Sequence, residues 1–280
     1  MNRLIEYAIC MFFLMVGLVS PIQAYTFYID DFTVTKNSTV FQDTFEDGNP
    51  PPSAPGFPQG YSVVGVFGPE NEGAYPGRLT IDSAGAVTRL APNGQSVLFQ
   101  GSTLNTNVGT NAELRKEHEL SVTGLFDFDV LSDDPVEFYG VRFSDRATGA
   151  GFQGNDVVGL QVFGTSNGAA LVRFQELDFV SGTVDILEEE LIAGNHDQIG
   201  LSLSTAANSL VVKASYWFID NGVQGAVTTF NTTVNIFEGE DWTRAQFLAG
   251  QVVPIPAALP LFLSALGMMG FAGWKRKKTV

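Results

Sequence analysis

Through the middle of the chain, apolar and polar residues alternate with a period of two. The clearest stretch runs from Leu120 to Val130, and the alternation recurs from Ile199 to Ser204. This is the side-chain period of a β-strand that buries one face. No amphipathic helix of convincing length competes with the strands. The polar segment Glu113–Glu119 is expected to form at most one helical turn.

Short strands are therefore expected along the whole middle region, separated by turns at close spacing. The predicted strands are 25–35, 40–45, 61–67, 78–81, 87–90, 97–100, 120–130, 136–143, 157–163, 171–179, 184–192, 199–204, 210–219, 223–230 and 245–248. The predicted turns lie at dipeptides that tolerate a positive φ angle, namely Asp47-Gly48, Asn93-Gly94, Asn167-Gly168 and Asn221-Gly222.

The number of strands and the lack of cysteine limit the domain organisation. The chain has 280 residues and one cysteine, Cys10, which lies in the N-terminal apolar run. The region 25–250 thus has no thiol, which excludes disulfides, cysteine metal ligands and cysteine nucleophiles there. So many strands in one block suit a single large sandwich of two antiparallel sheets.

The N-terminus has the features of a signal peptide. Asn2 and Arg3 form a short polar region, residues 7–19 form an apolar run, and Ala24 suits the position before a cleavage site. We expect residues 1–24 to be removed by signal peptidase before Tyr25. An uncleaved N-terminal anchor is the alternative.

The C-terminal region 251–280 has three parts. A Pro-x-Pro motif precedes 18 uncharged residues, 257–274, which as a helix would be about 27 Å long, just enough to cross a bilayer. A basic tail then stops translocation and stays in the cytoplasm. With an exported N-terminus, the sandwich would lie outside the inner membrane. The tail consists of Lys275, Arg276, Lys277 and Lys278.

This arrangement resembles the PEP-CTERM sorting signals that exosortases of Gram-negative, exopolysaccharide-producing bacteria recognise. The resemblance implies processing near the Pro-x-Pro motif and release to the cell surface or extracellular matrix. Ile255 stands where the commonest form of the signal has Glu. An ordinary membrane anchor is the alternative. The matching residues are Val253, Pro254, Ile255, Pro256, Ala257 and Ala258.

The middle region resembles the concanavalin A-like lectin and glucanase domains. The supporting stretches are 41–48, 138–145, 198–204 and 208–216. The resemblance implies an all-β jelly-roll sandwich, flanked here by a signal-peptide helix and a transmembrane helix. It implies no particular activity, because one fold carries many functions.

Charge excludes one class of partner. The region 25–250 holds 10 of the 15 basic and 29 of the 30 acidic residues, a charge of about −19. Such a surface repels nucleic acid, whose phosphates are negative.

No complete catalytic motif is present. Related glycosidases carry Glu-x-Asp-x-x-Glu on one strand, and the nearest stretch here begins with Glu176 and Asp178 but ends in Ser181. An exposed acidic strand is the favoured interpretation, and a diverged glycosidase or lyase is the alternative.

Structural calcium is the one inorganic ligand that the sequence suggests. Acidic residues cluster beside a glycine turn near the start of the domain, and in related folds the last strand adds a ligand. A simple capped turn is the favoured alternative. The candidate ligands are Asp43, Glu46, Asp47 and Asp241.

Aromatic residues are candidates for sugar contacts, because a ring face packs on a pyranose. Tyr139, Trp217 and Trp242 are the candidates, although the 23 Phe against 7 Tyr and 3 Trp indicate that most rings form the core. The expected function is a noncatalytic protein of the cell surface or exopolysaccharide. Carbohydrate binding is the alternative.

Overall fold

The described part of the chain consists of strands and turns. A computed structural model describes residues 26–46, 61–64, 78–82, 87–90, 96–104, 113–128, 131, 136–145, 157–178, 183–237 and 242–253. For 61–64, 79–82, 87–90, 96–104, 145, 242 and 253, it describes the backbone alone. Within these ranges there are 17 strands and no helix. The two predicted flanking helices lie outside them.

One sheet has eight strands, all antiparallel to their neighbours. Its central path is β15 (Val223–Gln224), β14 (Val211–Asp220), β13 (Gln198–Thr205), β8 (Leu120–Asp127), β1 (Thr26–Lys36) and β2 (Thr39–Asp43). Beside this path, β16 (Thr228–Thr233) pairs with β14, and β4 (Leu79–Asp82) pairs with β1.

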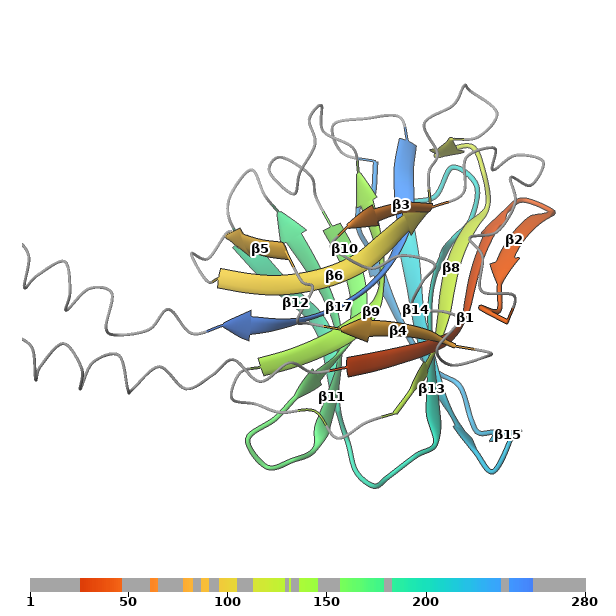
Figure 1. The fold of residues 1–280 in the computed structure, drawn as a ribbon. Coiled ribbons are helices and arrows are strands. Elements are labelled where there is room, and N and C mark those ends of the chain that lie inside the picture. Colours follow the sequence, from red (N-terminus) through yellow and green to blue (C-terminus); the bar gives the residue numbers. More distant parts are fainter. Residues whose placement is uncertain are drawn as a thin grey trace, which may run out of the picture. The chain divides into compact units, whose positions relative to one another are not determined.

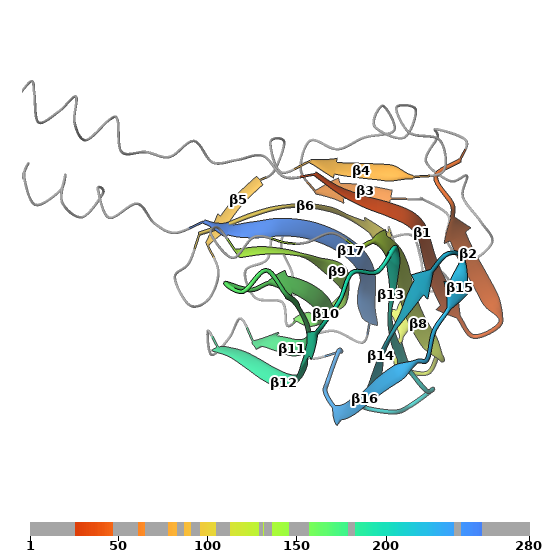
Figure 2. The ribbon, with the colours of Figure 1, turned by 90° about the horizontal axis from the view of Figure 1, so that it is seen from below.

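The second sheet has nine strands and is also antiparallel (Figure 1). Its order is β12 (Thr183–Ile192), β11 (Ala170–Asp178), β10 (Val157–Gly164), β9 (Val136–Asp145), β17 (Trp242–Val253), β6 (Ser96–Leu104) and β3 (Tyr61–Val64). In addition, β5 (Val87–Leu90) pairs with β6, and β7 (Leu114–Arg115) pairs with β17. Figure 2 shows β6, β17, β9, β10, β11 and β12 side by side in this order.

The core lies between the sheets, where one face of each strand is apolar. In β8 the burial alternates residue by residue, as the sequence predicts. Aromatic rings join the two layers: Phe32 of β1 meets Phe247 of β17 edge to face, with 4.8 Å between ring centroids. Phe27 and Phe126 pack against Tyr139 at 5.4 and 5.0 Å. The predicted two-sheet antiparallel jelly-roll sandwich is confirmed.

Three predicted elements differ from the structure. The strand predicted over 223–230 is two strands, β15 and β16, and both pair with β14. In the segment 113–119, Leu114 and Arg115 form a short strand paired with β17, and the predicted single turn follows it as a hydrogen-bonded turn, in which the His118 amide donates to the carbonyl oxygen of Arg115 at 3.0 Å. The last strand runs to Val253, so Gln251 and Val252, placed at the start of the C-terminal region, belong to the sandwich.

Two predicted turns lie in the described part of the chain, and both have the expected geometry. Asn221 and Gly222 have φ angles of 52° and 73°, which is the left-handed pair that a tight hairpin needs. Gly168 has a φ angle of 71°. The turns predicted at Asp47 and Asn93 lie outside the described residues.

Candidate binding site

The candidate site lies on the face of the nine-stranded sheet that points away from the core, here called the outer face. Tyr139, Val141 and Phe143 of β9 belong to the core. Because side chains alternate along a strand, Phe138 and Arg142 lie on the outer face. The register extends this face to β10, where Phe163 stands opposite Phe138.

A small apolar cluster on the outer face is separate from the core, and we call it the outer apolar cluster. Phe138 and Phe163 stack with 5.5 Å between ring centroids and 28° between ring planes. Both rings are mostly buried. The stack therefore forms a firm apolar floor rather than two loose surface rings. The cluster consists of Phe138, Phe163, Leu248, Val136, Leu171 and Val252.

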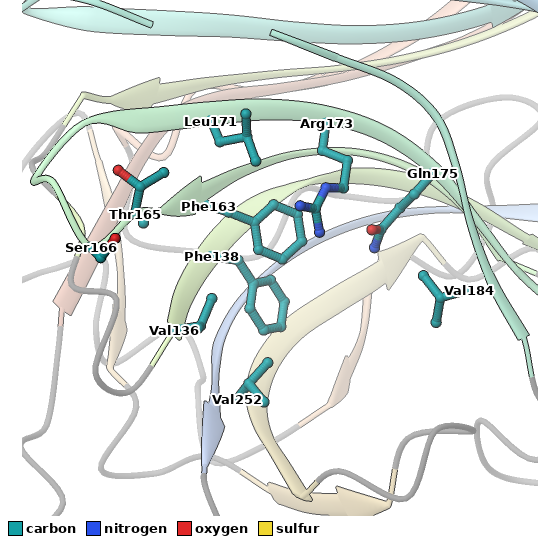
Figure 3. A pocket seen from close by; sticks show the side chains of 11 residues that line it. Val136, Phe138, Phe163, Thr165, Ser166, Leu171, Arg173, Gln175, Val184 and Val252 are labelled. Atoms are coloured by element: carbon teal, nitrogen blue, oxygen red, sulfur yellow. The ribbon is translucent and has the colours of Figure 1, made fainter. Parts of the chain in front are cut away.

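A cavity of about 460 Å³ adjoins this cluster, a size within the usual range for small-molecule sites. Its lining combines apolar and polar side chains. The rings of Phe138 and Phe163 lie at its centre, and the polar side chains around them include Arg173, Gln175 and Ser166 (Figure 3). An occupant would meet apolar surface on one side and hydrogen-bonding groups on another.

Arg173 is held at the cavity by contacts from both neighbouring strands. Its Nε donates to Oε2 of Glu189 on β12 at 3.3 Å. Its guanidinium carbon lies 4.8 Å from the centroid of the Phe163 ring on β10. This cation–π contact and the ion pair limit the positions of the guanidinium.

Two buried polar pairs continue the outer face beyond Arg173. Nε2 of Gln175 donates to Oε1 of Gln161 at 2.8 Å. Further across the sheet, Nε of Arg142 donates to Oε1 of Gln246 at 2.5 Å. Burial lowers the pKa of Arg142 to about 9, so its guanidinium still carries a positive charge at neutral pH.

The turn between β10 and β11 supplies the hydroxyl groups of the cavity lining. Oγ1 of Thr165 donates to the carbonyl oxygen of Ala169 at 2.8 Å, and the Gly168 amide donates to the carbonyl oxygen of Thr165 at 2.9 Å. These bonds close a tight turn that holds Thr165 and Ser166 beside the cavity.

The acidic strand residues do not line this cavity. Glu176 stands opposite Val158, which belongs to the core, so Glu176 and Asp178 lie on the face of β11 opposite to Arg173 and Gln175. Among the described residues that line the cavity, none is Asp or Glu.

Of the three aromatic candidates for sugar contact, Tyr139 is wrong. Its ring is fully buried between the sheets, because it lies on the same face of β9 as the core residues Val141 and Phe143. Trp217 is partly exposed and lies on the eight-stranded sheet, opposite Gly200. The side chain of Trp242 lies outside the described residues.

The proposed calcium ligands are only partly described. Asp43 is buried in β2, and its Oδ1 accepts the amide of Phe45 at 2.9 Å, as in a capped turn. Glu46 is exposed, while Asp47 and Asp241 lie outside the described residues. Where side chains are described, no group of three or more His, Cys, Asp or Glu is placed to hold a metal ion. Calcium binding stays a prediction.

The C-terminal signal is outside the described residues except at its first position. Val253 is the last residue of β17. Residues 254–258, the apolar segment 257–274 and Lys275 to Lys278 are not described, nor is the N-terminal segment 1–24. In the part of the chain that is described, no helix is long and apolar enough to cross a membrane.

A second group of charged side chains lies at one end of the eight-stranded sheet. Arg78 contacts both Asp30, at 3.4 Å, and Asp127, at 2.5 Å, and Gln198 donates to Asp30. Burial, and then the nearby Asp127 carboxylate, raise the pKa of Asp30 to about 6. Its strands β1, β8 and β13 belong to the other sheet, and none of these four residues lines the cavity.

Comparisons with known proteins give similarity at the level of fold only. The sequence matches no family model and no curated protein. Among solved structures, the chain is similar to a GH43_12 protein retrieved from capybara gut metagenome, with a TM-score of 0.39 and 10% identity. That match covers 76% of this chain and 34% of the other.

Two lectins are also similar in structure. The winged bean acidic lectin, complexed with methyl-α-D-galactose, gives a TM-score of 0.36 and 11% identity over 82% of this chain and 90% of the lectin. Lectin II from Ulex europaeus gives a TM-score of 0.33 and 10% identity, over 84% of this chain and 92% of the lectin. At these values the similarities say nothing about ligand or activity.

Proposed function

We propose that the sandwich binds a saccharide in the cavity on the outer face of the nine-stranded sheet. The observation that carries this proposal is the two-sided lining, in which the Phe138 and Phe163 rings adjoin Arg173, Gln175 and Ser166. A pyranose has apolar C–H faces and a rim of hydroxyl groups. Aromatic carbons suit the first, and guanidinium, amide and hydroxyl groups suit the second.

The proposal is for binding without catalysis. Glycoside hydrolysis by the usual route needs two carboxyl groups flanking the bond, about 5 to 10 Å apart. The described lining has Arg173 as its ionisable group and no acid. A diverged glycosidase is the alternative, and cleavage of an oligosaccharide that stops in Glu176→Gln protein would favour it.

Phe163 is the side chain whose loss should most weaken saccharide binding. We expect Phe163→Ala to lower the affinity for any bound oligosaccharide at least about tenfold, because it removes one ring of the stacked floor. Phe163→Leu, which keeps apolar volume but no ring, should lower it less and keep the fold intact. The measurement is calorimetry with the best ligands from a glycan array, run on the full chain.

Trp217→Ala is the matched control for this experiment. It removes a larger ring, but from the other sheet, and should leave the affinity unchanged. If Trp217→Ala abolished binding while both Phe163 variants retained it, the saccharide would bind on the eight-stranded sheet and the proposed site would be wrong.

We also propose that the protein is exported, held at first as an inner-membrane precursor, and sorted by an exosortase to the cell surface or an exopolysaccharide layer. The proposal is supported by the sequence alone, through the N-terminal apolar run, the Pro254-Ile255-Pro256 motif, the uncharged segment 257–274 and the basic tail. Binding of extracellular polysaccharide would suit such a location.

Processing of the C-terminus gives a direct test of sorting. In cells with an active exosortase, the surface form should lack Lys275 to Lys278, and its intact mass should place the cut near Pro254 to Pro256. Replacing Pro254 and Pro256 by alanine should leave the uncut precursor in the inner membrane. A surface form whose mass still includes the basic tail would rule out this route and favour an ordinary anchor.

A further inference from the structure

The described side chains on the outer face of β9 to β12 and β17 carry more basic than acidic groups, although the whole chain is acidic. The sequence carries 15 Lys and Arg against 30 Asp and Glu, yet Arg142, Arg173 and Arg244 lie on this face. In β9 to β12 and β17, Glu189 is the acid whose described side chain lies on the same face. Among the described side chains of these strands, this face thus carries three cations and one acid.

Arg173 presents a positive charge to the cavity. Its hydrogen bond to Glu189 uses Nε, at 3.3 Å, so the bond engages one edge of the guanidinium. Figure 3 shows the terminal end of the side chain directed toward the Phe163 ring and the cavity. The Glu189 side chain is 46% exposed on the edge strand, and an ion pair so open to water is weak. A carboxylate inside the cavity can therefore compete for this arginine.

Arg142 adds a second positive charge behind the cavity. On β10, Gly159 stands opposite both Gln175 of β11 and Arg142 of β9, so a residue without a side chain lies between them. The Arg142 side chain is buried, where charge is screened less than in water. Its field reaches the Gln175 side of the cavity, two strand spacings or about 10 Å away.

We propose that the saccharide bound in this cavity carries a carboxylate, as a uronic acid does, and that Arg173 binds that group. This inference rests on the proposed function and names its ligand class. The planar fork of a guanidinium matches a carboxylate with two parallel hydrogen bonds. One arginine balances the single charge of each uronate, while the Phe138 and Phe163 rings accept the apolar face of the sugar.

The test compares acidic oligosaccharides with their own methyl esters, which keep the sugar chain and remove the charge. The probes are oligogalacturonate, oligomannuronate and hyaluronan oligomers, each beside its ester, titrated into the full chain by calorimetry. At least one acid form should bind about tenfold or more tightly than its ester. The preference should shrink as salt is raised.

Variants at the ion pair separate this inference from a general role in stability. Arg173→Gln should abolish the preference for acid over ester, and Arg173→Lys should keep part of it as a point charge. Glu189→Gln, which changes the acidic partner of the same ion pair, should strengthen acid binding several-fold by removing the competing carboxylate. A merely structural role for the pair predicts losses of similar size for Arg173→Gln and Glu189→Gln, because each variant breaks the pair.

The outcomes are distinct. If neutral sugars bind in a Phe163-dependent way but acid and ester bind equally, the inference is overturned and the proposed function stands. If Arg173→Gln protein still prefers the acid over its ester, another group binds the carboxylate and the inference is overturned. If no saccharide binds, the proposed function fails and the inference fails with it.

Discussion

Gly140→Ala should lower the free energy of unfolding by at least about 3 kcal/mol, at the upper end of the usual cost of overpacking. A Cβ atom at Gly140 would lie 2.3 Å from the carbonyl oxygen of Leu160 and 2.8 Å from the Cα of Gln161. Both are backbone atoms of β10, which is paired with β9 on one side and β11 on the other. The strand cannot move away without breaking pairs in the centre of the sheet.

Gly159→Ala is the matched control, one strand away on the same outer face. The nearest atom to its added Cβ would be Cδ of Gln161 at 3.4 Å, which belongs to a flexible side chain. We expect a change within about 1 kcal/mol, since alanine also restricts the unfolded chain. Urea unfolding of the two variants beside the parent gives the comparison. If the two variants were equally stable, β10 would shift to accommodate the added Cβ at Gly140 and the prediction would be wrong.

The sandwich is predictable from the sequence because its signal is local. Where one face of a strand is buried and the other is not, as from Leu120 to Asp127, the sequence alternates and the burial follows it. The Asn221-Gly222 turn is predictable for the same reason, since two residues with positive φ require residues of this kind.

The candidate site is not predictable in the same way, because both faces of its strands are apolar or buried. All eight residues of β10 are buried, and in β9 the neighbours Phe138 and Tyr139 are both aromatic. The alternation of side chains along the strand therefore does not predict which of the two rings lies in the core. Tyr139 is a sequence candidate for sugar contact as a ring that could pack on a pyranose, yet it is Phe138, one residue away, that lies beside the cavity.

The position of Arg173 at the cavity follows from the strand register and is not visible in the sequence. Within its strand it is one polar residue between Val172 and Phe174. Its role at the cavity depends on Phe163 from β10 and Glu189 from β12, which are 10 and 16 residues away in the chain. The alternation of β11 does separate Arg173 and Gln175 from Glu176, so the period of two by itself argues against a shared cleft.

Asp30 should make the protein less stable as pH rises from about 4 to 7. The pKa of Asp30 is about 6 in the folded protein against 3.8 for an unperturbed group, so folding favours its protonated form. The stabilisation is complete below about pH 4 and is lost as pH rises through 6. One pKa unit corresponds to about 1.4 kcal/mol, so the loss approaches about 3 kcal/mol.

Two opposing sets of contacts determine this pKa, and variants can separate them. Burial and Asp127 raise it, while Arg78 and the amide of Gln198 lower it. Because asparagine mimics the protonated acid, the stability of Asp30→Asn relative to the parent should increase by up to about 3 kcal/mol between pH 4 and pH 7. Asp127→Asn removes one of the raising contacts and should move the loss to lower pH. If the difference between Asp30→Asn and the parent were the same at both pH values, the ion pair with Arg78 would outweigh burial, and Asp30 would be charged in the folded protein throughout this range.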